Sequence, residues 1–365
     1  MHAKPLVIVG ISGGVDSSVA ALLLKQQGFN VEAIFMKNWE EDDTDAYCSA
    51  AQDVQDASDV CKKLDIKLHT VNFAAEYWEL VFSHFLEEYK LGRTPNPDIL
   101  CNKEIKFKIF LDYAKHLKAN FIATGHYAKK IENNHETFLA KGIDEQKDQS
   151  YFLYTLTQLQ LASTLFPLAD YTKKQIRKIA LQAGLHNHNK KDSTGICFIG
   201  ERKFKQFLQK YIPAQPGAIV NITGKIIGQH DGLMYYTIGQ RKGLGIGGQQ
   251  KSSSAPWYVI DKNMAKNQLV VTQGNNDAAL FASKLMATKL HWITRQPTTN
   301  NFQCKAKIRY RQPDQLCSIN IEPSGNCLVT FTQPQRAITP GQSIVFYNQS
   351  ICLGGGIINY AIKEQ

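Results

Sequence analysis

The stretch Gly10-Ile11-Ser12-Gly13-Gly14-Val15-Asp16-Ser17-Ser18 decides how the N-terminal part of this chain of 365 residues folds. It overlaps the end of an apolar run, residues 6–11, that predicts a short buried strand, and it leads into residues 15–27, which have helical periodicity. Glycines between a strand and a helix let the backbone approach a ligand, and the N–H groups at the helix start favour an anion. The stretch therefore predicts a phosphate-binding loop, with a plain tight turn as the alternative.

Two familiar nucleotide loops do not fit this stretch. The G-K-[ST] ending of a Walker A loop is absent, so no lysine of the loop itself reaches a terminal phosphate. The G-x-G-x-x-G pattern of dinucleotide-binding proteins is absent as well. The loop is therefore expected to bind a nucleotide in another way.

Strands and helices alternate on the C-terminal side of the loop. Strands are predicted at residues 31–36, 67–72 and 120–128, and helices at residues 46–64, 75–91 and 103–117. This alternation predicts an α/β fold with a doubly wound parallel sheet. Beyond residue 200, short β-rich runs alternate with turn residues, which is typical of small β-barrels or sandwiches. The predicted division is a catalytic domain at 1–204, a small β-rich domain at 205–278 and a C-terminal β-barrel at 279–365.

Charge is distributed unevenly along the chain. Residues 201–365 hold 19 Lys and Arg against 7 Asp and Glu, whereas residues 1–200 hold 23 against 25. The basic C-terminal part predicts a polyanionic partner, with nucleic acid the first candidate, although a basic surface can also serve solubility alone. No apolar run reaches the ~20 residues of a membrane helix, and the N-terminal apolar stretch is too short for a signal peptide, so a cytoplasmic protein without a membrane partner is expected.

Two of the eight cysteines lie in stretches that suggest chemistry. Cys101 follows Pro95 and Pro97, which predict an exposed, stiff loop, with a helix starting at Asp98 or Asn102. Lysines 103 and 106 beside a helix start would lower the pKa of this thiol, and Asp98 could exchange a proton. Cys197 lies between Gly195 and Gly200 in a predicted loop. Each cysteine alone could equally be a buried structural thiol.

Seven motifs together resemble the tRNA-specific 2-thiouridylases of bacteria, which are PP-loop ATP pyrophosphatases of the adenine nucleotide alpha hydrolase-like fold. The resemblance covers nearly the whole chain. The motifs are the loop quoted above, Asn96-Pro97-Asp98-Ile99-Leu100-Cys101-Asn102, Thr124-Gly125-His126-Tyr127-Ala128, residues 147–153, residues 193–202, residues 236–248 and residues 307–312.

The resemblance implies ATP as substrate, bound by the loop and by the ends of later strands. The implied ATP-binding residues are Gly10, Ile11, Ser12, Gly13, Gly14, Val15, Asp16, Ser17, Met36 and Gly125. Asp16 or another acid of the loop is expected to help hold Mg²⁺ with the leaving pyrophosphate, since Mg²⁺ prefers phosphates and one or two carboxylates. No residue is assigned to a resident metal site.

The resemblance also implies sulfur transfer to the wobble uridine of the tRNAs for Lys, Glu and Gln. ATP would adenylate the C2 oxygen of the uracil, Cys197 would carry a persulfide received from a donor protein, and Cys101 would attack it and leave a transient disulfide. The implied catalytic residues are Cys101, Cys197 and Asp98. The implied contacts to the target base are Asn96, Pro97 and Asp98, and those to tRNA are Lys147, Asp148, Gln149, Arg309 and Tyr310.

Several alternatives stay open from the sequence. The basic, glycine-rich residues 240–248 could grip RNA phosphates or form only a flexible connection. The acidic run at residues 40–45 is read as a solvated loop and helix start rather than a metal site. His126 is expected to line the site. A PP-loop ligase acting on a small substrate would need neither cysteine, and a non-enzymatic RNA-binding protein would not need the intact loop.

Overall fold

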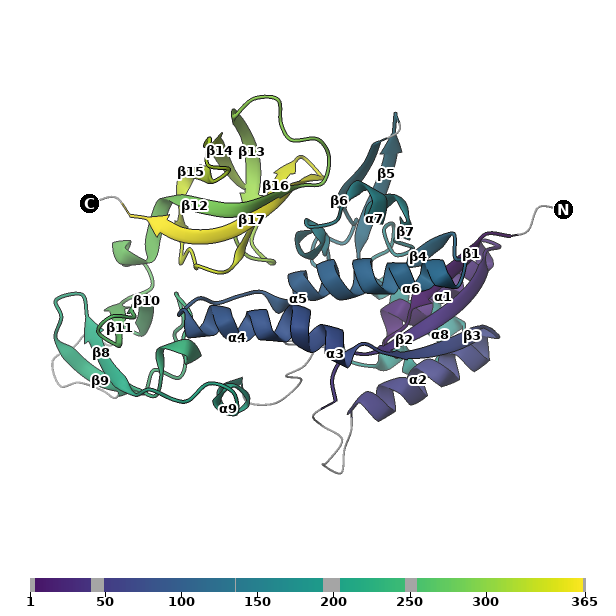
Figure 1. Cartoon of the computed structure of the whole chain (residues 1–365), viewed down its shortest axis with the longest axis horizontal. Coiled ribbons are helices and arrows are strands. Elements are labelled where there is room, and N and C mark those ends of the chain that lie inside the picture. Colours follow the sequence, from purple (N-terminus) through teal and green to yellow (C-terminus); the bar gives the residue numbers. More distant parts are fainter. Residues whose placement is uncertain (1–3, 41–48, 135, 193–203, 247–254, 364–365) are drawn as a thin grey trace.

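The computed structural model describes residues 4–40, 49–134, 136–192, 204–246 and 255–363. Within these ranges five parallel strands form the N-terminal sheet, in the spatial order β3 (Lys67–Asn72), β2 (Asn30–Lys37), β1 (Leu6–Gly10), β4 (Phe121–Ala123) and β7 (Thr164–Leu165) (Figure 1). The strand order reverses between β1 and β4. Ligands bind at such a reversal in open α/β sheets. The predicted parallel sheet is confirmed.

Helices cover both faces of this sheet because the side chains of β1 alternate between two apolar clusters. Val7 and Val9 belong to the cluster shared with helices α1, α2 and α8, whereas Ile8 belongs to the cluster on the opposite face. The first group consists of α1 (Val15–Gln26), α2 (Ser49–Leu64) and α8 (Lys173–Gln182). The second consists of α3 (Ala74–Tyr77), η1 (Trp78–Phe82), α4 (Ser83–Lys90), α5 (Pro97–Leu100), η2 (Cys101–Ile109) and α6 (Phe110–His116).

The helices predicted at 75–91 and 103–117 are present, and each contains a π-helical segment. These segments are η1 and η2, which continue directly into α4 and α6. The second helix starts earlier than predicted, at Pro97, because proline is tolerated in the first turn of a helix. Short α7 (Gln158–Ala162) and α9 (Phe204–Gln209), and the 3₁₀ turns η3 (Ser150–Leu153), η4 (His186–Asn189), η5 (Leu233–Tyr235) and η6 (Ala278–Leu280), complete the described helices.

A hairpin of the N-terminal region leaves the parallel sheet and joins the C-terminal one. The strand predicted at 120–128 ends at Ala123, and the chain then forms β5 (Ala128–Asn133) and β6 (Glu136–Lys141). Strand β6 pairs with β17 (Ile351–Ile362), opposite Ile351 and Cys352. The sequence boundary expected near residue 204 therefore does not separate the sheets.

The remaining strands form two β-rich parts, as predicted. The central part is a sheet in the order β10 (Trp257–Asn263), β11 (Gln268–Gln273), β8 (Gly217–Asn221) and β9 (Ile226–His230). The C-terminal part contains β12 (Phe281–Trp292), β15 (Cys327–Arg336), β14 (Gln315–Ile321), β13 (Asn301–Lys307) and β16 (Ser343–Asn348), followed by β17. Because β12 pairs with both β15 and β17, these strands close into a barrel around their own apolar cluster.

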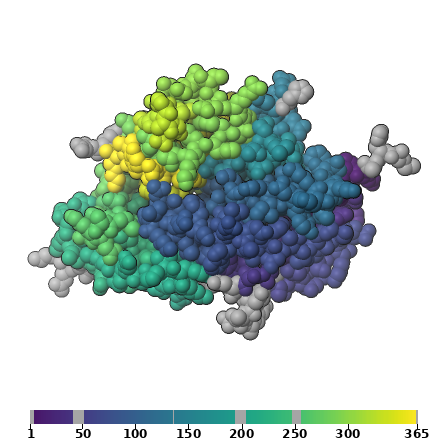
Figure 2. Space-filling view, in the orientation of Figure 1, coloured from purple at the N-terminus to yellow at the C-terminus, as the bar shows by residue number. Residues whose placement is uncertain are grey.

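The barrel and the central sheet both pack against the N-terminal part, as Figure 2 shows for one face of the molecule. They meet at residues 91–96, which we call the junction loop. This loop follows α4 and precedes α5. None of the helices within the described ranges has the length and apolar character of a membrane span.

Candidate functional site

The predicted phosphate loop, residues 10–18, connects β1 to α1 at the point where the strand order reverses. Gly14 caps α1 without a side-chain hydrogen bond, so no side chain occupies the first N–H groups of this helix as a cap. The Ser17 hydroxyl donates to the Gly14 carbonyl oxygen at 3.1 Å and accepts from the Ser12 N–H at 3.2 Å. The loop thus presents a helix N-terminus with fixed hydroxyl groups, which is suited to a phosphate.

Glycine is required at two positions around this loop. Gly13 has φ +73°, and a Cβ there would lie 2.5 Å from the carbonyl oxygen of Asp53. Gly125, which follows β4, lies so close to the start of α1 that a Cβ would lie 2.8 Å from the Ser17 nitrogen. A Cβ on Gly10 would lie 3.4 Å from the Met36 Cε. The structure therefore brings the predicted ATP-binding residues of three strand ends together.

Asp16, in the first turn of α1, is engaged by two side chains from other elements. Lys173 at the start of α8 approaches both carboxylate oxygens at 2.7 Å, and the Tyr127 hydroxyl donates to Oδ1 at 2.7 Å. The same ammonium also lies 2.7 Å from Asp192. Lys173 was not predicted from the sequence as a site residue. The Thr172–Gln175 capping box could have located the helix start, but no local signal connects it to the loop.

Asp192 is the centre of a second part of this polar network. Burial alone would raise its pKa, but Lys147 at 2.6 Å and Lys173 lower it to about 2. Arg177 of α8 adds an ion pair at 3.0 Å. Asp192 is therefore ionised over the whole physiological range, and its charge is offset by three cations.

The carbonyl side of the loop is held by two further residues that were not predicted from the sequence. Asn187 donates to the Gly13 carbonyl oxygen at 3.0 Å and to the Ser18 hydroxyl at 2.9 Å. Lys190 also reaches the Gly13 oxygen at 3.4 Å, and its ammonium pairs with Asp53 and with Asp56. These contacts fix the turn from behind and leave its N–H side to a ligand.

Cys101 does not lie on an exposed loop, so that prediction was wrong. The residue is only 1% exposed and is the first residue of η2. The helix begins before it, because the Asn96 side chain caps Pro97–Leu100 by accepting from the Asp98 N–H at 3.2 Å. The predicted caps, Asp98 and Asn102, are wrong for the same reason. A π-helical segment is rare and is often found at functional sites.

Two titratable groups lie near Lys106, which belongs to the same helical segment η2 as Cys101. Burial raises the pKa of Asp98, and the positive charge of Lys106 offsets part of that rise. Burial lowers the pKa of His126 well below its ordinary value, and Lys106 lowers it further. His126 is therefore neutral at pH 7, with its Nδ1 2.8 Å from the Thr124 hydroxyl. With a raised pKa, Asp98 releases its proton less readily than an exposed carboxyl group does, which suits a group that exchanges protons.

The junction loop is attached to both β-rich parts just before Asn96. Lys262 of the central sheet donates to the Gly92 carbonyl oxygen at 2.9 Å. From the barrel, Gln342 donates to the Thr94 carbonyl oxygen at 2.7 Å, and the Thr94 N–H donates to the Pro340 carbonyl oxygen at 2.9 Å. The residues expected to contact the target base therefore sit at the end of a loop that three parts of the molecule position.

The structure brings together the two stretches predicted to contact tRNA. The Tyr310 hydroxyl donates to the Lys147 carbonyl oxygen at 3.2 Å. Asp148 is buried and accepts from Ser150, and Gln149 accepts from the Tyr127 N–H at 3.0 Å, so both side chains face the protein.

Arg309 and Tyr310 lie just beyond the end of β13, whose last residue is Lys307. The Arg309 guanidinium donates to the carbonyl oxygens of Ile238 and Ala337 and to the Thr339 hydroxyl. Its side chain therefore links the central sheet to the barrel at the exposed surface.

Some predicted residues lie outside the described ranges. Cys197 falls within residues 193–203, and Gly247 and Gly248 end the basic loop in another such range. The structure therefore gives no distance between Cys101 and Cys197. The six cysteines that the structure describes are buried.

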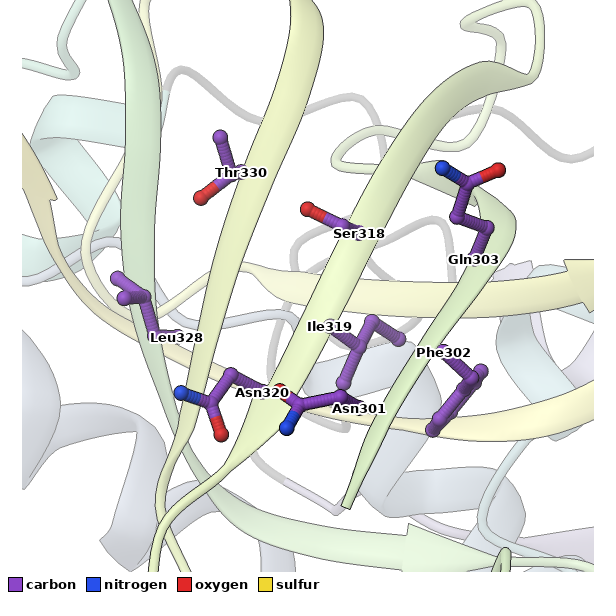
Figure 3. Close-up of a pocket in the computed structure, with 8 residues that line it drawn as sticks. All are labelled: Asn301, Phe302, Gln303, Ser318, Ile319, Asn320, Leu328 and Thr330. Atoms are coloured by element: carbon purple, nitrogen blue, oxygen red, sulfur yellow. The ribbon is translucent and has the colours of Figure 1, made fainter. Parts of the chain in front are cut away.

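A shallow pocket of ≈ 290 Å³ lies elsewhere, on the outer face of β13, β14 and β15 (Figure 3). Its polar lining includes the side chains of Asn301, Gln303, Ser318, Asn320 and Thr330. It has no charged lining residue and includes no predicted site residue. A polyphosphate would find no positive charge in it, so it is not the nucleotide site.

Comparisons with known proteins give two kinds of match. The model of the tRNA methyl transferase HUP domain matches residues 5–201, that of the tRNA methyl transferase PRC-barrel domain residues 205–273, and that of the aminomethyltransferase beta-barrel domain residues 282–358. The tRNA-specific 2-thiouridylase MnmA of Psychromonas ingrahamii is 60% identical over 364 residues, which are 100% of this chain and 99% of that protein.

Two further relatives carry the same name. The MnmA of Marinomonas sp. is 59% identical over 98% of this chain and 92% of its own length, and that of Sodalis glossinidius is 59% identical over 98% and 97%. The domain models are described as tRNA methyl transferase and aminomethyltransferase domains, whereas the relatives are named tRNA-specific 2-thiouridylases. The relatives span the whole chain, whereas each model spans one part of it.

Proposed function

This chain belongs to the family of tRNA-specific 2-thiouridylases, and on that premise we propose that it thiolates the wobble uridine of the tRNAs for Lys, Glu and Gln at the expense of ATP. The family name supports an enzyme that transfers sulfur to a tRNA uridine. The observation that carries the finer proposal is the packing of His126 against Phe107, with 5.7 Å between ring centroids. It joins the Gly125 stretch, next to the phosphate loop, to the helical segment η2, whose first residue is Cys101.

ATP would bind with its phosphates at the start of α1. The adenosine end would lie toward Met36 and Gly125, at the ends of β2 and β4. Adenylation of the uracil C2 oxygen would release pyrophosphate and make AMP the leaving group. Asp16 fits a Mg²⁺ ion, since a single carboxylate beside phosphate oxygens is a common magnesium environment, and the ion would offset charge on the leaving pyrophosphate.

Cys101 and Cys197 would share the sulfur chemistry. A donor protein would load Cys197 with a sulfane sulfur, giving a persulfide. The Cys101 thiolate would attack the Cys197 sulfur, forming a Cys101–Cys197 disulfide and releasing hydrosulfide, which would attack C2 and expel AMP. A cellular thiol would then reduce the disulfide. Asp98 would exchange the protons of this sequence, because burial raises the pKa of its carboxyl group.

The tRNA would contact both ends of the chain. The basic C-terminal part would attract its phosphates, and the paired stretches at Lys147–Gln149 and Arg309–Tyr310 would contact the anticodon arm. Asn96, Pro97 and Asp98 would meet the extruded uracil at the end of the junction loop. On the division at 1–204, 205–278 and 279–365, the first part would carry catalysis and some of the tRNA contacts, and the two β-rich parts would carry the other tRNA contacts.

One experiment tests this function directly. The protein is incubated with ATP, Mg²⁺, a persulfide donor and unmodified tRNA for Lys, Glu or Gln, and thiolation is detected as retarded migration on a mercury gel. Cys101→Ser and Cys197→Ser should each abolish thiolation while ATP-dependent adenylation survives. Full activity of either variant with the persulfide donor would refute the two-cysteine mechanism, and adenylation of a non-nucleic acid substrate instead of tRNA would refute the substrate.

A further inference from the structure

The phosphate loop carries a negative charge, on Asp16, that no other residue of the loop neutralises. Asp16 places a carboxylate in the first turn of α1, beside the N–H groups that would meet the ATP phosphates. A carboxylate opposes a polyphosphate unless a cation offsets it. Residues 10–18 contain no lysine or arginine. The positive charge must therefore come from outside the loop.

Lys173 lies where it can supply this positive charge. Its side chain is 12% exposed, and its ammonium lies 2.7 Å from both oxygens of Asp16. The residue is the first of α8, whose start is fixed by the Thr172 cap and by a hydrogen bond from the Lys173 N–H to the Asp144 carboxylate at 2.8 Å. Helices α8 and α1 share one apolar cluster, which includes Ile176 and Val19. A packed helix start thus holds this cation beside the loop.

Both carboxylates that hold Lys173 have other partners. Asp192 also pairs with Lys147 and Arg177, and Asp16 also accepts from the Tyr127 hydroxyl. If the ammonium moves toward a phosphate, neither carboxylate is left without a donor. The arrangement therefore lets Lys173 change partners at small cost, since an unpaired buried charge is what makes breaking an ion pair expensive.

We propose that Lys173 is the phosphate-binding cation of this PP-loop, contacting the ATP polyphosphate and the leaving pyrophosphate in the role that a loop lysine has in Walker A proteins. The inference rests on the proposed ATP-dependent function. A Lys173 contact would strengthen as negative charge develops on the departing pyrophosphate, so Lys173 acts on the bond-breaking step as well as on binding.

Lys190 is the other lysine near the loop, and its contacts point to a different role. Its ammonium pairs with Asp53 and Asp56 and reaches the Gly13 carbonyl oxygen. The carbonyl side of the turn is the side away from a phosphate bound by N–H groups. Lys190 therefore stabilises the shape of the loop.

The test compares ATP binding, measured by calorimetry with ATP alone in EDTA and with ATP and Mg²⁺, and pyrophosphate release in the presence of unmodified tRNA. Lys173→Met should weaken ATP binding about ten- to a hundred-fold, the range expected for a lost charge-assisted hydrogen bond, and Lys173→Arg should recover most of it. Lys174→Met is the matched control. It removes the charge of the exposed lysine next to Lys173 on α8, so binding should equal that of the wild type.

A double variant separates phosphate binding from mere neutralisation of Asp16. In Asp16→Asn/Lys173→Met the whole Asp16–Lys173 ion pair is gone, so no carboxylate of the loop opposes ATP. Asp192 keeps its ion pairs with Lys147 and Arg177, so its charge is not left unpaired. ATP binding in EDTA should stay weak, whereas Asp16→Asn alone should bind ATP at least as well as the wild type does in EDTA. Wild-type binding by the double variant or by Lys173→Met would overturn the inference. A wild-type protein that neither binds ATP nor releases pyrophosphate would instead overturn the proposed function.

Discussion

The hydroxyl of Tyr310 donates a hydrogen bond to the carbonyl oxygen of Lys147, across 3.2 Å and 163 residues of sequence. The Tyr310 ring also lies 4.4 Å, centroid to centroid, from the ring of Phe152. A loop of the barrel and a loop of the N-terminal part therefore form one continuous surface. A tRNA that contacts one of them meets the other.

The first prediction separates the ring of Tyr310 from its hydroxyl. Tyr310→Ala should weaken tRNA binding by about ten-fold or more, because a base stacked on an aromatic ring contributes roughly 1–3 kcal/mol. Tyr310→Phe keeps the ring and loses one hydrogen bond, so its loss should be smaller. Filter binding over a range of salt concentrations measures both. Tyr360→Ala, at an exposed tyrosine of the barrel, is the control, and equal affinities of all variants would contradict the prediction.

Local features of this site could be predicted from the sequence, and long-range pairings could not. The phosphate loop was predictable because glycines 13 and 14, a preceding apolar strand and a following helix are all adjacent in the chain. The Tyr310–Lys147 contact and the Lys173–Asp16 ion pair depend on how distant elements pack. The hairpin β5–β6 joins the barrel for the same reason, since its partner strand lies over 200 residues away.

The misplacement of Cys101 has a more specific cause. Two prolines in close succession suggest a break in structure, yet Pro97 occupies the first turn of a helix that Asn96 caps. The burial of Cys101 then follows from its place on the inner face of that helix, within the larger apolar cluster.

The second prediction concerns the accessibility of Cys101. Because the thiol is 1% exposed, iodoacetamide should alkylate Cys101 at least about ten-fold more slowly in the folded protein than in the protein unfolded by urea. Peptide mass spectrometry resolves this cysteine from the others, and buried Cys61 of α2 is an internal reference that should be similarly protected. Equal rates of Cys101 alkylation with and without urea would mean that the thiol is open to solvent, as the sequence alone suggested.

The third prediction compares two glycines of positive φ. Gly13→Ala should both destabilise the protein and abolish ATP binding, because the new Cβ would lie 2.5 Å from the Asp53 carbonyl oxygen. Gly28→Ala meets no atom within 4 Å, so it should cost only the ~1–2 kcal/mol of a left-handed backbone. Thermal unfolding and ATP calorimetry measure both effects. Equal melting temperatures and unchanged ATP binding for the two variants would refute the steric argument.

The fourth prediction is a loss of stability in mild acid that depends on His126. Burial, and then the charge of Lys106, hold its pKa well below 6.5, so the native protein keeps this ring neutral. Below pH ~6.5 the unfolded chain binds a proton that the folded chain does not, and stability falls by up to ~1.4 kcal/mol per pH unit. Melting temperatures between pH 8 and pH 5 should therefore decrease less for His126→Gln than for the wild type.

A remaining slope is expected in that variant. Burial also lowers the pKa of His230, in the central sheet, so this histidine adds to the same acid dependence. His126→Gln/His230→Gln should be flatter than either single variant. Parallel profiles for the wild type and His126→Gln would show that His126 protonates freely in the folded protein.

The last prediction concerns Lys262, which attaches the central sheet to the junction loop. Burial lowers the pKa of this lysine to about 8, while its ammonium donates to the Gly92 carbonyl oxygen at 2.9 Å. Below pH 8 both the folded and the unfolded chain carry the proton, and the folded state bears the full desolvation cost. Between pH 8 and ~10.4 the unfolded chain retains a proton that the folded chain has released, so this group makes stability rise with pH. Lys262→Met should remove that rise from a series of melting temperatures, whereas Lys266→Met, at an exposed lysine in the turn between β10 and β11, should keep it. If the melting temperatures of Lys262→Met and Lys266→Met changed equally between pH 8 and pH 10, the Lys262 ammonium would have to be solvated. The hydrogen bond from Lys262 to the junction loop would then not involve a desolvated charge.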